Sequence, residues 1–226
     1  MAHFRAVASL AEEMAATASR LKKRAAIASA IAEAHPSANA GLFAQYLAGL
    51  PFAEWDSRKL NAGGALLTRA VLTVSGAANA ELTAAYRRHG DLGAAAFDLL
   101  DSNKEPAANR EQRNPLTLED VSQAFAAIAV ARTTASRSTL LERLLGQATP
   151  IEAKYLIKLM LGDMRIGVKQ SLVEEAIAVA ASVPVADVRH AVMLEADLAG
   201  ATERAFAGTL GEARMRLFHP LGFMLA

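Results

Sequence analysis

Apolar side chains recur every three or four positions through most of the chain, which is the spacing that places them on one face of an α-helix. Phe4, Val7 and Leu10 show this spacing near the start, and the runs 121–128 and 172–177 repeat it. No segment alternates apolar and polar residues for long, as a half-buried strand does. The pattern predicts an all-α fold.

Glycine and proline separate the apolar runs and predict where helices end. They stand at Pro36, Pro51, Gly63, Gly64, Gly90, Pro106, Pro115, Pro150, Gly162, Gly167, Pro184 and Pro220. The polar stretch 101–114 can bury little apolar surface, so we interpret it as a linker that divides the chain near its middle.

The two halves resemble one another when the chain is aligned with itself. RLKKR lies over TASRS, and HPSANAGLFAQYLAGL lies over TPIEAKYLIKLMLGDM with Pro36 on Pro150. After an insertion around PFAEWDSRK, LNAGG lies over MRIGV. Two more residues in the second half then bring Ala70 onto Ala176 and YRRHGDLG over VMLEADLA. Chance similarity between alanine-rich helices is the alternative, but the shared order of these features favours a duplication.

A duplicated helical unit predicts two related halves. We expect pseudo-repeats over 1–100 and 115–210, joined by the linker 101–114. A pseudo-twofold axis would relate them, so that equivalent loops emerge on related faces.

Composition excludes several classes of protein. With 226 residues, 53% of them hydrophobic, the chain can bury a sizeable core. The absence of cysteine excludes a disulfide scaffold and any thiolate metal site. No apolar run reaches the roughly 20 residues that a membrane-spanning helix needs, and we expect a cytoplasmic protein without a membrane partner. The net charge is only +1, so nucleic-acid binding would depend on where the charges lie.

Few residues suggest catalysis. The five histidines are scattered, with no pair at ligand spacing on one helix, so we expect no metal site. Asp91 and Asp197 each precede a leucine and an alanine-rich run, where an aspartate caps a helix well. We therefore favour helix capping over acid–base chemistry for both residues.

The segment 161–170 is the strongest candidate for binding a ligand. It predicts a helix that ends at Gly162, a loop that contains Arg165, and a second helix whose free amides start near Gly167. Amides and a guanidinium group can bind phosphates, and glycines let the main chain approach closely. A capped turn in which Arg165 is solvated or pairs with Asp163 fits the same residues equally well.

A resemblance to a known family favours the first interpretation. The run EAKYLIKLMLGDMRIGVKQSLVEEAIAVA resembles the DNA-binding domain of ATP-dependent DNA ligases, in which a helix, a Gly-x-x-Arg-Ile-Gly loop and a second helix recur. VARTTASRSTLLERLLGQATPIEA and YRRHGDLGAAAFDLL resemble two further segments of that domain. PLGFMLA, at 220–226, resembles the family's junction to its nucleotidyltransferase domain, although Gly222-Phe223 stands where a proline is usual.

The resemblance implies that residues 1–219 form an all-helical DNA-binding domain and that 220–226 begin the junction. The nucleotidyltransferase and OB-fold domains of such a ligase would then be absent from this chain. The family seals nicks through a lysine–AMP adduct at Lys-x-Asp-Gly, with ATP and Mg²⁺. None of the lysines here precedes x-Asp-Gly. We therefore expect no catalytic residue, no cofactor and no ligation by this chain alone.

The implied partner is nicked double-stranded DNA, bound through its minor groove and phosphates without sequence preference, in repair, replication or recombination. The family motif implies a main DNA-contacting loop made of Gly162, Met164, Arg165, Ile166, Gly167 and Lys169. Basic helix starts and the repeat add Lys22, Lys23, Ser136, Arg137 and Ser138. The glycine loops at Asn61, Gly63 and Gly64 and at Gly90 and Asp91 are further candidates. Ile166 is as compatible with the core as with a contact. An α-solenoid-like scaffold that binds protein is the alternative function, but it requires three or more repeats.

Overall fold

The computed structural model describes residues 2–35, 39–102, 115–217 and 219. Throughout these ranges the regular secondary structure is helical, apart from one isolated bridge between His3 and Thr117. The all-α prediction is therefore confirmed. Most of the predicted linker, 103–114, and the predicted junction, 220–226, lie outside the described residues.

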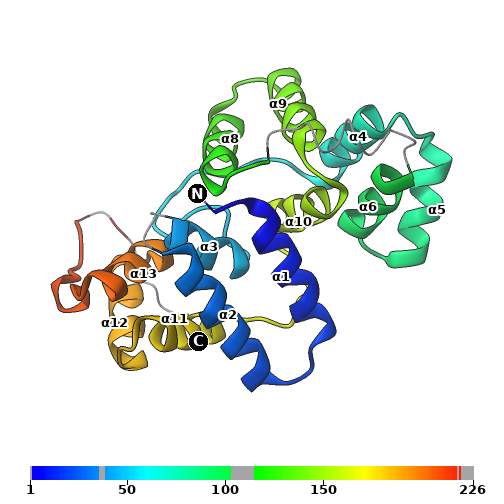
Figure 1. Cartoon of the computed structure of the whole chain (residues 1–226). Helices are drawn as coiled ribbons and strands as arrows, with labels where there is room; N and C mark the ends of the chain where they lie inside the picture. The colour runs from blue at the N-terminus through cyan, green and yellow to red at the C-terminus, as the bar shows by residue number, and fades with distance from the viewer. Residues whose placement is uncertain (1, 36–38, 103–114, 218, 220–226) are drawn as a thin grey trace. The chain divides into compact units, whose positions relative to one another are not determined.

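The helices follow one another along the chain (Figure 1), and a long stretch without regular structure, 48–63, joins α3 to α4. The first half contains α1 (Phe4–Ala16), α2 (Arg20–Ala34), α3 (Asn39–Leu47), α4 (Gly64–Ser75), α5 (Asn79–His89) and α6 (Leu92–Ser102). The second half contains α8 (Leu118–Val130), α9 (Thr134–Gln147), α10 (Pro150–Leu161), α11 (Gln170–Ala181), α12 (Val185–Glu195) and α13 (Leu198–Ala207), followed by the 3-10 turn η1 (Leu210–Glu212). The first two residues assigned to the linker thus belong to α6.

Local hydrogen bonds explain several of these boundaries. The side chains of Ser19 and Thr133 accept hydrogen bonds from first-turn amides of α2 and α9. Thr117 and Asp120 form a reciprocal capping box at the start of α8. Such caps satisfy amides that have no partner within the helix. Gly162 ends α10 in the left-handed conformation that glycine adopts readily.

The helices form two compact units, and each unit takes helices from both halves of the sequence. Unit 1 contains α2 and α3 together with α11, α12 and α13, whereas unit 2 contains α4 to α6 together with α8 to α10. The first residues of α1 belong to unit 2 and the rest to unit 1. Each unit therefore combines the front of one predicted repeat with the back of the other.

Packing within the two units follows the same scheme. In unit 1, α2 packs on α11 and α3 packs on α13; in unit 2, the equivalent helices α9 and α10 pack on α4 and α6. A β-carbon at Gly41 of α3 would lie 2.7 Å from the carbonyl oxygen of Ala199, and one at Gly93 of α6 would lie 2.5 Å from that of Lys154. Glycine thus permits the close approach of the crossing helices in both units. None of the described helices has the length and apolar character needed to cross a membrane.

Candidate nucleic-acid interface

The loop between α10 and α11 alternates buried and exposed side chains. Met164 and Ile166 are 7% and 2% exposed, while Arg165 between them is an exposed residue. The burial of Ile166 places it in the core, which is one of the two roles that the sequence allowed. Met164 was expected to contact DNA, but its burial makes it an interior residue. The two apolar side chains anchor the loop on either side of Arg165.

The backbone of this loop turns sharply. Gly162, Arg165 and Gly167 all have positive φ, at 69°, 51° and 62°. For a residue with a β-carbon the left-handed conformation costs roughly 1–2 kcal/mol, so the surrounding structure must hold Arg165 in place. Strained residues of this kind occur often at binding sites.

Lys23 holds the loop from the side of α2. Its Nζ donates hydrogen bonds to the carbonyl oxygens of Ile166, at 2.7 Å, and Gly167, at 3.2 Å. The residue is buried, so its ammonium group is committed to these carbonyls and acts as a support for the loop. The signal was present in the sequence: Lys23 stands four positions before the buried Ile27, on the core face of the helix.

Lys22 and Lys169 lie on the exposed surface of unit 1. Lys22 stands in the first turn of α2, and Lys169 is the N-cap residue of α11, where no side chain accepts from the first-turn amides. Within the described part of the chain, neither lysine has a carboxylate partner. The start of α11 therefore offers free amides beside a cation, which suits an anion.

Unit 2 contains a loop of the same design before α4. Leu60 and Ala62 are both 6% exposed, and Asn61 between them is exposed with φ of 49°. Gly63 then forms the N-cap of α4, again without a side-chain hydrogen bond, and Gly64 opens the helix at the surface. The self-alignment placed LNAGG over MRIGV, so Asn61 corresponds to Arg165.

The remaining non-glycine residues with positive φ in the described ranges fit the same alignment. Ser182, at 55°, corresponds to Gly76, at 66°; Ala196, at 50°, corresponds to Gly90, at 60°. Each pair ends a helix: α11 and α4 in the first case, α12 and α5 in the second. Backbone geometry therefore follows the register of the aligned sequences.

The start of α9 is built from hydroxyl groups and one arginine. Ser136 is exposed, and its amide and hydroxyl both bond to Oγ1 of Thr133. The guanidinium group of Arg137 donates to the carbonyl oxygen of Ala131 at 2.6 Å. Ser138 is buried, and its hydroxyl donates to Glu142. Ser136 thus remains the most accessible of the three predicted contacts on this helix.

The two aspartates that follow Gly90 and Ala196 are helix caps, as predicted. Asp91 accepts a hydrogen bond from the amide of Ala94 at 2.8 Å, and Asp197 accepts one from that of Gly200 at the same distance. Asp91 also forms an ion pair with Lys158, in which both side chains are nearly buried. These contacts give Asp91 a structural role. Gly90, which precedes it, is an exposed turn residue.

The described residues contain no cluster of histidine, aspartate and glutamate that could hold a metal ion. Burial, and then the charge of Asp197, raise the pKa of Glu203. At Asp120 the hydrogen bonds of the capping box lower the pKa. Burial and helix capping therefore account for both shifts.

Comparison with known proteins places these features in context. A sequence model of the family described as DNA ligase N terminus matches residues 3–178. A protein named probable DNA ligase from Koribacter versatilis is 42% identical over 220 residues, covering 97% of this chain and 37% of that protein. Another protein of that name, from Opitutus terrae, is 37% identical over 243 residues, covering 96% and 24%.

A more distant relative gives the same picture. A protein named DNA ligase from Methanosphaerula palustris is 34% identical over 187 residues, covering 82% of this chain and 34% of that protein. The chain thus spans well under half the length of each of these relatives.

Proposed function

Because the chain belongs to the family of N-terminal domains of ATP-dependent DNA ligases, we propose that it binds nicked duplex DNA through the phosphate backbone, with little dependence on base sequence. The minor groove presents nearly the same hydrogen-bonding pattern for different base pairs, so contacts there and to phosphates carry little sequence information. The chain is then the DNA-binding part of a longer enzyme.

The observation that carries this proposal is the loop around Arg165. Buried apolar residues on both sides of Arg165 fix the backbone of this loop, and the ammonium group of Lys23 donates to two of its carbonyl oxygens. The loop leads directly into the uncapped start of α11. A phosphate beside Arg165 would accept hydrogen bonds from the guanidinium group and from first-turn amides of the helix.

The equivalent loop of unit 2 extends the proposal to a second phosphate. Asn61 has the backbone conformation of Arg165, and Gly63 precedes another uncapped helix start. An asparagine side chain can donate to a phosphate oxygen but contributes no charge. We therefore assign the stronger electrostatic contact to Arg165 and the start of α11, which belong to unit 1, and a weaker, neutral contact to the loop before α4 in unit 2.

The activity of the longer protein belongs to the same proposal. The relatives carry the name DNA ligase and extend far beyond the matched region. We propose that ATP and Mg²⁺ act in their additional domains and that this chain contributes substrate binding, in repair, replication or recombination of DNA.

Salt dependence of DNA binding tests the proposed function. Fluorescence anisotropy of a labelled nicked duplex, titrated with the protein at several salt concentrations, should give a linear fall of log affinity against log salt, with a slope of about −0.9 for each phosphate neutralised. A second duplex of unrelated sequence should give the same line. An affinity that does not change with salt concentration, or binding that requires one base sequence, would contradict phosphate recognition.

A further inference from the structure

Glu175, near the middle of α11, holds two arginines that come from two other helices of unit 1. Nη2 of Arg20, in the first turn of α2, donates to Oε1 of Glu175 at 2.9 Å. Nη2 of Arg189, on α12, donates to the same oxygen at 3.2 Å. One carboxylate oxygen therefore links α2, α11 and α12.

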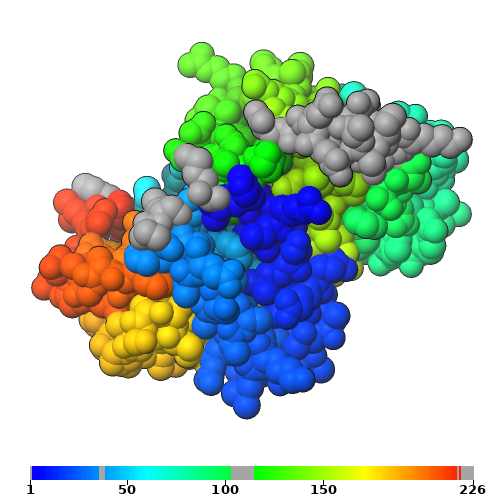
Figure 2. All heavy atoms as spheres, in the orientation of Figure 1, coloured from blue at the N-terminus to red at the C-terminus, as the bar shows by residue number. Residues whose placement is uncertain are grey.

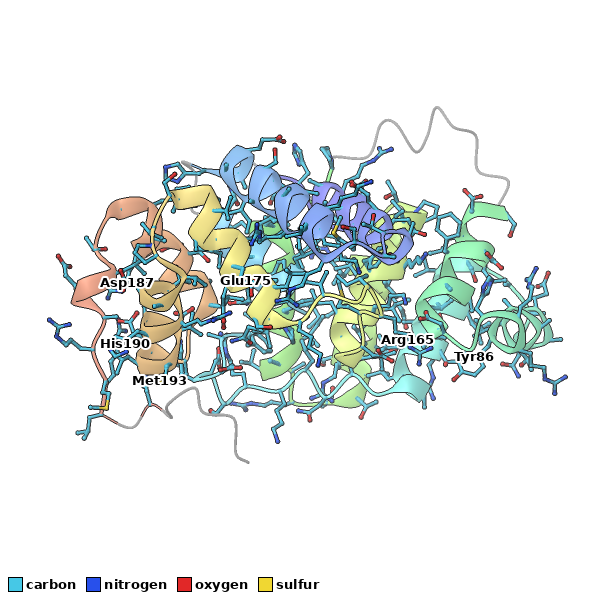
Figure 3. The ribbon with its side chains drawn as sticks, turned by 90° about the horizontal axis from the view of Figure 1, so that it is seen from below. Tyr86, Arg165, Glu175, Asp187, His190 and Met193 are labelled. Carbon is cyan, nitrogen blue, oxygen red and sulfur yellow. The ribbon has the colours of Figure 1, made fainter. Side chains whose placement is uncertain are left out.

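Exposure differs between the acid and the arginines. The side chain of Glu175 is 22% exposed, whereas those of Arg20 and Arg189 are 60% and 47% exposed. The carboxylate thus lies deeper than the guanidinium groups that it holds. Figure 2 shows α2 and α11 side by side on one face of the molecule, and Figure 3 shows Glu175 on α11.

Glu174 fixes the second arginine further. Its Oε2 accepts a hydrogen bond from Nε of Arg189 at 3.4 Å, and its Oε1 accepts one from Gln170 at 3.2 Å. A guanidinium group has five N–H donors, of which these contacts use one in Arg20 and two in Arg189. Among the described residues the other donors have no hydrogen-bond acceptor, so they can serve a ligand.

Unit 2 shows that the helices can pack without such a network. The self-alignment places Arg69 at the position of Glu175, and Thr134 and Thr83 at those of Arg20 and Arg189. Helix α9 nevertheless packs on α4 as α2 packs on α11. All three residues of unit 2 are exposed. Arg69 and Thr134 have side chains of the types that donate to DNA phosphates, whereas the hydroxyl group of Thr83 donates to the carbonyl oxygen of Asn79 at 2.8 Å. The surface therefore offers phosphate donors in both units, although the side chains differ.

We propose that Glu175 is a positioning residue that holds Arg20 and Arg189 with their remaining donors outward, as a preorganised pair for the phosphates of bound DNA. This inference rests on the proposed DNA-binding function. A long side chain that is already held loses less conformational entropy when it binds, and the saving is about 0.5–1.5 kcal/mol for each side chain. Glu175 thereby strengthens the binding of a polyanion even though it carries a negative charge.

The sign of one substitution distinguishes positioning from simple charge. Glu175→Gln removes a negative charge, so charge alone predicts tighter DNA binding. Positioning predicts weaker binding, by about three- to tenfold, with a smaller salt slope because fewer arginines engage phosphates. Asp187→Asn is the matched control: Asp187 is exposed on α12 of the same unit (Figure 3), and its substitution makes the same change in charge. We expect the control to bind as tightly as the unchanged protein, or slightly more tightly.

Anisotropy on the nicked duplex, with a thermal melt of each variant, completes the test. Binding by Glu175→Gln that is equal to or tighter than that of the unchanged protein overturns the positioning role and leaves the proposed function intact. Failure of the unchanged protein to bind in a salt-dependent way overturns the proposed function itself. If Glu175→Gln does not fold, Glu175→Asp replaces it, because it keeps the negative charge but draws the carboxylate back from both arginines; weaker binding supports the assignment, and unchanged binding refutes it.

Discussion

Arg165→Ala should weaken DNA binding and leave the stability of the protein almost unchanged. Arginine and alanine both carry a β-carbon and meet the same penalty at a φ of 51°, so the substitution leaves the backbone cost in place and removes only the side chain beyond that carbon. Because Met164 and Ile166 supply the buried contacts of the loop, the packing of the loop should survive.

The magnitude follows from the loss of one charge-assisted phosphate contact. Such a contact contributes about 1–3 kcal/mol, so affinity should fall by about 5- to 150-fold at fixed salt, and the log–log salt slope should fall by about one. Arg165→Lys should restore the slope but only part of the affinity, since lysine keeps the charge and loses the planar fork of donors. Arg165→Gly should bind as weakly as the alanine variant, because it lacks the same group.

Anisotropy on a nicked duplex, measured beside thermal melts, checks this prediction. A structural role for Arg165, for example as a partner of Asp163, predicts the opposite pattern: a lower melting temperature with unchanged affinity per folded molecule. Normal DNA binding by a folded Arg165→Ala variant would refute the assignment of this loop.

Three further substitutions test the supports of the fold, each by unfolding experiments. Lys23→Met should lower the free energy of unfolding by about 1–3 kcal/mol, because it removes both hydrogen bonds to the loop carbonyls. Asp91→Asn should cost about 3–5 kcal/mol, because it leaves the charge of the nearly buried Lys158 without its partner; a loss below 1 kcal/mol would contradict a tight pair. The pKa of Asp120 lies below its usual value of 3.8, so the contribution of this residue to stability is present at neutral pH and lost as the pH falls through its folded-state pKa. Asp120→Asn should therefore make stability less dependent on pH in the acid range. If the free energy of unfolding of the variant falls with decreasing pH as steeply as that of the unchanged protein, the role of the capping box is contradicted.

The sequence predicted the helices of this fold better than it predicted which helices pack on one another. Apolar spacing indicated helices, and Gly90, Gly162 and Pro184 fall between them, but the breaks at 17–19 and 131–133 contain neither glycine nor proline. The order of Leu and Ala after Asp91 and Asp197 correctly indicated caps. Periodicity defines which face of a helix is buried, but not which helix covers it. The exchange of helices between the two halves was therefore invisible until the structure placed α2 on α11 and α9 on α4.

The candidate site was predictable in part for the same reason. Arg165 and Lys169 were expected at the surface and lie there. The neighbours Lys22 and Lys23 were both expected to contact DNA, although Lys22 is exposed and Lys23 is buried. The role of Glu175 was not foreseen, because its partner Arg20 lies 155 positions away and no local pattern joins them. Contacts of this kind appear only when the fold brings distant helices together.

Hydrogen–deuterium exchange with and without a nicked duplex tests the central claim most directly. First-turn amides without a helical or side-chain acceptor exchange quickly unless a ligand covers them. Saturation with DNA should slow exchange at 63–65, the start of α4, and at 167–171, the start of α11, while 118–120, which begins the capped helix α8, should keep its rate. Protection at both starts is the result that phosphate binding by both units predicts. Unchanged exchange at both starts, under conditions where anisotropy shows the DNA to be bound, would contradict it.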